Sequence, residues 1–316
     1  MTSILDQIGR TPLLPLQHIA RGLAVPVLVK CEHLNPGGSV KDRIAVAIVD
    51  DAERRGLLRP GDTLIEATAG NTGIGLALVA AVRGYKLVCV MPEEMSVDKR
   101  VALATLGARV IVTPSARPDH PDNFKNVAPR LAAENGWFLT DQFNNLVNVL
   151  VHEATTGPEI LKQTSGHVGA FVAGAGTGGT ITGVGRFLKA RLPHVRIVLA
   201  DPVGSGLAQW VETGVVGPDA VFQVEGIGSH KPPTILDRMV IDVVERITDE
   251  ESFAMVKPLL REEGLLVGGS AGTAVAAAVR IAERGEVTEP VVALLPDGWD
   301  RYRSKPWMQA WMSDPR

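Results

Sequence analysis

The sequence predicts an α/β protein whose parallel sheets carry helices on both faces. Short apolar segments of strand length alternate with helix-like segments along the whole chain. Several of these apolar segments run directly into glycine-rich turns that precede a helix. Such alternation is typical of parallel strands joined by crossover helices. The composition, 45% hydrophobic and 21% charged residues, is ordinary for a soluble globular protein.

The expected elements follow from the apolar runs and the periodic segments. Buried strands are predicted at Pro26–Lys30, Thr63–Glu66, Lys86–Met91, Ala108–Val112, Trp137–Thr140, Ala170–Ala173, Arg196–Ala200 and Val291–Leu295. Helices are predicted at Val40–Arg55, Ile74–Arg83, Val97–Leu106, Val184–Lys189, Glu250–Glu263 and Thr273–Glu283. The prolines and charges of Pro114–Asn123 predict an exposed loop.

The net charge, the apolar runs and the cysteines limit which partners and which cellular compartment are expected for this protein. The 32 basic and 35 acidic residues give a net charge of −3, without the basic excess of a nucleic-acid-binding protein. The first residues lack the apolar core of a signal peptide, and the longest apolar run, Leu76–Val82, is too short to span a bilayer. Cys31 and Cys89 show neither metal-ligand spacing nor a disulfide framework. We therefore expect two buried thiols in a cytoplasmic protein.

The first candidate motif is Gly37–Arg43, a glycine turn at the start of a helix. The glycines allow a sharp turn, and Ser39 is expected to cap the helix. Lys41 then lies in the first helical turn, where the helix dipole disfavours a positive charge. This placement suits a lysine that acts as a neutral amine in a Schiff base. By itself the motif also fits a surface lysine.

Two further turns precede helices and offer anion-binding groups. Glu66–Gly73 places Thr68, Asn71 and Thr72 near backbone N–H groups that can hold a carboxylate. Without a ligand, the same turn would be a capped polar loop. In Gly268–Gly272, Ser270 offers a neutral hydroxyl to a ring nitrogen, or alternatively an N-cap.

The run Gly174–Thr180 follows a strand and opens a helix, which predicts a phosphate site. The run also satisfies the dinucleotide pattern G-x-G-x-x-G, and Asp201 ends the next strand as such a site requires. The hydroxyls of Thr177 and Thr180 suit a phosphate monoester better than a bridging pyrophosphate. An NAD-binding oxidoreductase is therefore the rival interpretation.

Together, and in this order, the motifs resemble the cysteine synthase and cystathionine β-synthase family, the fold type II pyridoxal-phosphate enzymes. The resemblance covers nearly the whole chain. It is carried by Ile8–Pro12, Ser39–Arg43, Thr68–Gly73, Asp141–Gln142, Gly176–Thr180, Glu225–Gly228, Gly268–Gly272 and Leu295–Asp297. It implies two domains with the cofactor in the cleft between them: a larger one of residues 1–34 plus 149–316 and a smaller one of residues 35–148. It also implies a homodimer.

The resemblance further implies a role for each motif. Lys41 would form the Schiff base with pyridoxal 5'-phosphate and move the proton at Cα. Asn71 would bind the phenolic oxygen of the cofactor, and Ser270 would face its pyridine nitrogen. The phosphate would be held by Gly176, Thr177, Gly178, Gly179 and Thr180, with Pro296 also at the cofactor. The substrate would be bound by Thr68, Ala69, Gly70, Thr72 and Gln142, with Gly226 at the entrance.

The implied reaction replaces the β-substituent of serine, or of an O-activated serine, with a thiol. A serine at the ring nitrogen does not keep that nitrogen protonated, which favours loss of the β-substituent over transamination. Ala69 stands where most relatives have serine, so the donor stays open among serine, O-acetylserine and O-phosphoserine.

Ser229–Lys231 carries more charge than in most relatives, which favours a substrate with an anionic group, such as the carboxylate of homocysteine or the phosphate of O-phosphoserine. Alternatively, the side chains of His230 and Lys231 simply point into solvent. The charge favours homocysteine, with cystathionine as product, over sulfide as acceptor. Amine-accepting β-replacement, β-elimination from serine or cysteine, and cofactor binding without turnover are also compatible with these residues.

Overall fold

The computed structural model describes residues 3–68, 70–95, 97–117, 119–218 and 220–313, and divides into two compact units. One unit comprises residues 1–8, 35–147 and 300–316, and the other comprises residues 9–34 and 148–299. Below they are called the lysine unit and the phosphate-loop unit, after the motifs they contain. The terminal segments 1–8 and 300–316 group with the lysine unit, whereas the sequence placed them in the larger domain. The predicted domain bounds stay a prediction.

The phosphate-loop unit is built on a six-stranded sheet with the order β1-β2-β10-β7-β8-β9. All neighbours are parallel except β1, which pairs antiparallel with β2 at one edge. Its strands are β1 (Leu13–Pro15), β2 (Val27–Cys31), β7 (Ala170–Ala173), β8 (Arg196–Pro202), β9 (Val243–Ile247) and β10 (Val291–Leu295). Its helices are α6 (Gly157–Gln163), α7 (Gly179–Lys189), α8 (Leu207–Thr213), α9 (Asp249–Arg261) and α10 (Gly269–Glu283).

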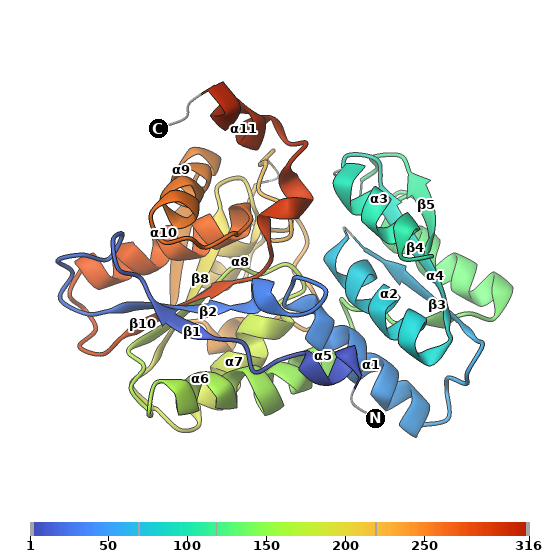
Figure 1. Cartoon of the computed structure of the whole chain (residues 1–316), viewed down its shortest axis with the longest axis horizontal. Helices are drawn as coiled ribbons and strands as arrows, with labels where there is room; N and C mark the ends of the chain where they lie inside the picture. Colours follow the sequence, from blue (N-terminus) through green and yellow to red (C-terminus); the bar gives the residue numbers. More distant parts are fainter. Residues whose placement is uncertain (1–2, 69, 96, 118, 219, 314–316) are drawn as a thin grey trace. The chain divides into compact units, whose positions relative to one another are not determined.

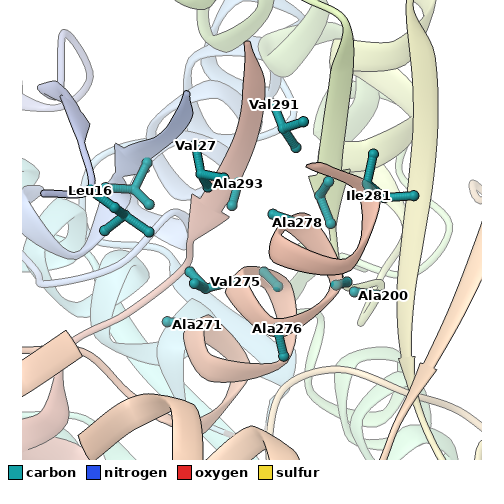
Figure 2. Close-up of a cluster of buried hydrophobic side chains, with 14 of the residues drawn as sticks. Leu16, Val27, Ala200, Ala271, Val275, Ala276, Ala278, Ile281, Val291 and Ala293 are labelled. Atoms are coloured by element: carbon teal, nitrogen blue, oxygen red, sulfur yellow. The ribbon is translucent and has the colours of Figure 1, made fainter. Parts of the chain in front are cut away.

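Helix α10 packs on one face of this sheet and forms the centre of its core, with α9 beside it (Figure 1). Figure 2 shows the short side chains of Ala271, Ala276 and Ala278 on the helix and those of Val291 and Ala293 on the strand side. Alanines let the helix approach the sheet closely, because they add little volume. Helices α6 and α7 are packed together at the opposite face (Figure 1).

The lysine unit contains a four-stranded parallel sheet with the order β5-β4-β3-β6. Its strands are β3 (Thr63–Ala67), β4 (Lys86–Pro92), β5 (Arg109–Thr113) and β6 (Phe138–Leu139), and its helices are α1 (Lys41–Arg54), α2 (Asn71–Arg83), α3 (Val97–Thr105), α4 (Phe124–Asn135) and α11 (Pro306–Gln309). Helix α5 (Val147–Val151) spans the boundary of the units. Helices α1, α2 and α3 share one apolar cluster with this sheet, and α4 packs on the other face of the sheet (Figure 1).

Short helical turns complete the chain. They are 3-10 turns at Ile4–Gln7, Glu32–Leu34, Arg238–Val240, Trp299–Tyr302 and Ala310–Ser313, and a π-helical turn at His152–Thr156.

The α/β class with parallel sheets is confirmed, but some predicted elements differ. Buried strands were expected at Ala108–Val112 and Trp137–Thr140; the strands there, β5 and β6, are partly exposed because each forms an edge of its sheet. Helix α4 was not predicted, since Pro129 lies inside it. Strand β9 was also missed, because the adjacent charges of Glu245 and Arg246 interrupt its apolar run. Cys31 and Cys89 are buried free thiols, as expected. Within the described residues no helix is long and apolar enough to cross a membrane.

A buried lysine anchors the segment Arg10–Pro12 within the phosphate-loop unit. Lys30 on β2 donates to the Thr11 carbonyl oxygen at 2.7 Å and forms an ion pair with Glu159 on α6 at 2.7 Å. The same carboxylate accepts from the Arg10 backbone N–H at 2.9 Å. This segment is therefore fixed at the edge of the sheet.

Candidate active-site residues

The predicted site residues come from both units, and most of those that the structure describes lie at the carboxyl ends of strands or the amino ends of helices. In open parallel sheets this is the edge at which ligands bind. The phosphate loop connects β7 to α7. A Cβ at Gly176 would lie 2.3 Å from the Gly226 carbonyl oxygen, so the loop and the Glu225–Gly228 turn are in direct backbone contact. The Gly228 N–H also donates to the Ala175 carbonyl oxygen at 2.9 Å.

Two buried threonines of this loop are oriented by side chains that the sequence analysis did not identify. Thr177 Oγ1 accepts from Asn148 Nδ2 at 3.0 Å and from the Gly179 N–H at 3.4 Å. A hydroxyl carries one hydrogen, so that of Thr177 remains to be donated to another acceptor. Thr180 Oγ1 lies 3.1 Å from His152 Nε2, and His152 Nδ1 lies 2.9 Å from Thr156 Oγ1.

Ser270 lies one residue inside α10, and Pro296 follows β10 directly. The N-cap alternative for Ser270 is wrong, because Gly268 occupies the cap position. The Gly268 N–H donates to the Asp297 carbonyl oxygen at 3.1 Å. The structure therefore brings these two predicted segments together at one end of the sheet.

In the lysine unit, Lys41 is the first residue of α1. The turn before it is held by Asp42, whose carboxylate accepts from the Gly37 N–H at 2.6 Å. Ser39 Oγ accepts from the Lys41 N–H at 3.2 Å, although the cap position itself is Val40. Gly38 has φ +77°, a conformation that favours glycine. The turn is therefore fixed by groups within the motif.

Asn71 begins α2, which packs against α1. Its Oδ1 accepts from Arg301 Nη1 at 2.6 Å. The same guanidinium donates through Nη2 to the Gly37 carbonyl oxygen, so one arginine contacts both predicted cofactor segments of this unit. Sequence reasoning missed Arg301, which lies 230 residues from Asn71 and has no local motif.

The predicted carboxylate loop follows β3. Thr68 Oγ1 accepts from the N–H groups of Gly70 at 3.0 Å and Gly73 at 3.3 Å, so its own hydrogen is available for donation. Thr72 donates to Gln142 Oε1 at 2.5 Å. Ala69 lies outside the described residues.

Gln142 donates inward, to the Ala67 carbonyl oxygen at 2.8 Å and to Glu66 Oε1 at 3.4 Å. In this arrangement the Gln142 amide holds the loop to β3, and its predicted contact with the substrate stays a prediction.

Glu66, on β3, carries a buried carboxyl group next to this loop. It accepts from Thr140 Oγ1 and from the Gln142 N–H. Burial raises the pKa of Glu66 from 4.5 to about 7 in spite of these hydrogen bonds. The carboxyl is thus poised to change charge near neutral pH.

We expect Glu66 to make the protein less stable as pH rises from about 4.5 to about 7. The folded protein binds this proton more tightly than the unfolded chain, so protonation stabilises the fold and the gain is lost as pH rises through the folded-state pKa. Each unit of pKa difference corresponds to about 1.4 kcal/mol. Urea unfolding across this range should show a weaker pH dependence for Glu66→Gln than for wild type. Parallel curves would contradict this assignment, and the exposed Glu134→Gln serves as control.

Hydrogen bonds within the charged turn Ser229–Lys231 hold its backbone in place. Ser229 Oγ donates to the Lys231 carbonyl oxygen at 2.6 Å and accepts from the Lys231 N–H at 3.2 Å. The His230 ring lies 5.6 Å from that of Phe222, and Lys231 is exposed.

Asp201 does not present its carboxylate to a ligand. It is fully buried, and its Oδ2 accepts from the Ala208 N–H at 2.8 Å in the first turn of α8. A carboxylate committed to a helix start is unsuited to bind a ribose, which weakens the dinucleotide interpretation.

Comparison with known proteins decides between the two interpretations. Residues 4–297 match the family model "Pyridoxal-phosphate dependent enzyme". The chain belongs to this family. The predicted cofactor, pyridoxal phosphate, is confirmed, and the NAD-binding alternative is wrong.

Relatives within the family carry names of related activities. The chain is 48% identical to cystathionine beta-synthase of Oryctolagus cuniculus over 99% of its own length and 57% of that protein. It thus spans little more than half of this relative. It is 41% identical to cysteine synthase of Staphylococcus aureus, with 96% of each covered. Among solved structures, O-ureido-L-serine synthase matches with TM-score 0.90 and 40% identity, covering 99% of both chains.

The residues of the phosphate loop fit the phosphate of this cofactor. Thr177 keeps a hydrogen to donate, and the loop leads into the N-terminus of the eleven-residue helix α7, whose backbone N–H groups favour an anion. Gly176 leaves the backbone without a side chain where the loop meets Gly226.

Thr180→Val should weaken retention of pyridoxal phosphate by about 1–3 kcal/mol, because the variant removes a buried hydroxyl from the phosphate loop. The control is Thr182→Val on the same helix, which removes a buried hydroxyl that accepts from the Asp237 N–H. Both variants should lose stability, but only Thr180→Val should release cofactor more readily during dialysis. Equal cofactor retention in the two variants would refute a phosphate role for Thr180.

Proposed function

We propose that the protein catalyses a pyridoxal-phosphate-dependent β-replacement, in which serine or an O-activated serine exchanges its β-substituent for a thiol. One observation carries the proposal: the chain is similar over nearly its whole length to enzymes named for cystathionine, cysteine and O-ureido-L-serine. Each of these compounds is an alanine derivative with a sulfur or oxygen atom at Cβ. The reaction class is therefore common to all three, while the nucleophile differs.

Each of the predicted cofactor motifs supplies one part of the proposed cofactor binding. Lys41 holds the cofactor covalently and moves the proton at the substrate Cα, and Asn71 donates to the phenolic oxygen. Gly176 to Thr180 bind the phosphate, Ser270 faces the pyridine nitrogen, and Pro296 lies beside the ring. When bound, pyridoxal phosphate withdraws electrons from Cα and so makes that proton removable.

The substrate carboxylate is bound by the turn between β3 and α2. Thr68 has a hydroxyl hydrogen to donate, and the first turn of α2 offers backbone N–H groups at Thr72. Since the hydroxyl of Thr72 is donated to Gln142, that side chain acts mainly by holding the turn. Ala69 and Gly70 are also proposed to bind the substrate, and Gly226 to line the entrance.

A donor-by-acceptor matrix tests the proposal. Serine, O-acetylserine and O-phosphoserine are each combined with homocysteine, sulfide, an amine and hydroxyurea, and the products are identified by mass spectrometry. Hydroxyurea is included because its oxygen would yield the product named for the solved structure that matches at full length. A β-substituted alanine formed in any of the reactions with a thiol supports the proposal. Pyruvate alone would indicate β-elimination, and no turnover in any well would contradict an enzymatic role.

Within this class we favour homocysteine as acceptor. Lys231 is exposed on the turn that follows Gly226, where its charge would attract the carboxylate of an amino-acid thiol. Lys231→Ala should lower kcat/KM for homocysteine by roughly two- to fivefold, the size of an exposed charge interaction. Because sulfide needs no such contact, kcat/KM for sulfide should be unchanged in Lys231→Ala. The exposed control Lys162→Ala should leave kcat/KM unchanged with either acceptor. Equal losses for both acceptors would argue against this role.

We further propose that the enzyme is a cytoplasmic homodimer. Light scattering coupled to size-exclusion chromatography tests the oligomeric state; a monomeric mass would contradict it.

A further inference from the structure

We propose that Arg301 is a positioning residue that fixes the donor side of Asn71 and the turn ahead of Lys41. The inference rests on the proposed contact between Asn71 and the phenolic oxygen of the cofactor. Arg301 itself need not touch cofactor or substrate.

One buried guanidinium connects the two segments. Arg301 lies in the 3-10 turn Trp299–Tyr302, donates to Asn71 Oδ1 at 2.6 Å and also donates to the Gly37 carbonyl oxygen. A Cβ at Gly38 would lie 2.5 Å from Arg301 Nη2, so the missing side chain makes room for the guanidinium. The amino ends of α1 and α2 are thereby held by a single planar group.

The hydrogen-bond donors and acceptors in this contact determine which atom of the Asn71 amide faces away from Arg301. A guanidinium only donates hydrogen bonds, whereas an amide both donates and accepts. Arg301 therefore engages the amide oxygen of Asn71, so the amide nitrogen is the end that faces away from the guanidinium. A phenolate oxygen accepts such a bond, but it would repel the amide oxygen. Arg301 thus selects the orientation that the proposed cofactor contact needs.

The residues that follow Arg301 are anchored to α3 by two further contacts. The Ser304 N–H donates to Asp98 on α3 at 3.0 Å. Lys99 Nζ lies 4.6 Å from the centre of the buried Tyr302 ring, a cation–π contact. These contacts restrict the motion of the turn, so the guanidinium is presented in a defined position.

Four single variants test the role. Arg301→Met removes the donor, Arg301→Gln supplies a group that both donates and accepts, and Arg301→Lys keeps a donor-only group. Arg303→Met is the matched control, since Arg303 is exposed and donates to the carbonyl oxygen of the nearby Asp300. The dissociation constant for pyridoxal phosphate is measured by adding cofactor to the apoprotein, and the visible absorption of the bound cofactor is recorded as a function of pH.

We expect Arg301→Met and Arg301→Gln to raise the dissociation constant on the order of tenfold, as for a lost hydrogen bond to a charged group. Both should shift the pH dependence of the absorption in the same direction as Asn71→Ala. Arg301→Lys should shift it less, and Arg303→Met should match wild type. If Arg301→Met does not fold, the comparison of Arg301→Lys with Arg301→Gln carries the test.

A double-mutant cycle separates this inference from the proposed role of Asn71. In the Asn71→Ala background, Arg301→Gln should have little further effect on affinity or absorption. A full additional loss in that background would show that Arg301 acts only on the structure, and would overturn the inference alone. If Asn71→Ala itself leaves both properties unchanged, the cofactor contact of Asn71 fails, and the inference fails with it.

Discussion

Lys41→Ala should abolish turnover while leaving the fold and reversible cofactor binding in place. Lys41 is the first residue of α1, after a turn held by Asp42 and Arg301. Its amine is proposed both to hold the cofactor and to move the Cα proton. Loss of the proton-transfer function alone costs about 10²–10⁴-fold in rate, so we expect kcat to fall by at least about a thousandfold.

Borohydride reduction separates covalent attachment from binding. In wild type it should link the cofactor to the peptide that contains Lys41, as seen by mass spectrometry. In Lys41→Ala no linkage should form, although cofactor should still be retained by the phosphate loop. The control is Lys86→Ala, an exposed lysine at the start of β4. Normal turnover in Lys41→Ala, or linkage at another lysine, would refute the assignment.

Lys30→Met should lower the free energy of unfolding by about 3–5 kcal/mol, the usual cost of removing one partner of a buried ion pair. The Lys30 side chain is 0% exposed and that of Glu159 only 17%. The variant removes the Lys30 cation from this carboxylate and the donor to Gln163 and to the Thr11 carbonyl oxygen. Urea unfolding of the purified protein measures the loss.

The control for this effect is Lys189→Met, which breaks the Lys189–Asp242 pair of the same unit. Those side chains are 31% and 35% exposed, so we expect a loss of no more than about 1 kcal/mol. Glu159→Met combined with Lys30→Met should recover part of the stability, because no buried charge is left unpaired. If Lys30→Met costs no more than the control, the buried pair does not stabilise the fold.

The sequence by itself determined the fold class, the cofactor and the local turns. The turns at Gly37–Lys41 and Gly176–Thr180 are contiguous in the chain, and their chemistry depends on glycines and hydroxyls a few residues apart. Such short-range patterns can be recognised from the sequence alone. The buried parallel strands were likewise visible as apolar runs, because strands covered on both faces need no polar side chains.

Only the tertiary structure decided which side chains support these turns. Arg301 and Asn71 are 230 residues apart, and His152 and Thr180 are 28 apart, so no local pattern records either contact. The inward orientation of Gln142 depends on the neighbouring strand β3, through Ala67 and the buried Glu66. The exposed edges at β5 and β6 depend on strand order. Contacts of this kind arise when distant segments pack, and their free energy is a property of the assembled fold rather than of any segment.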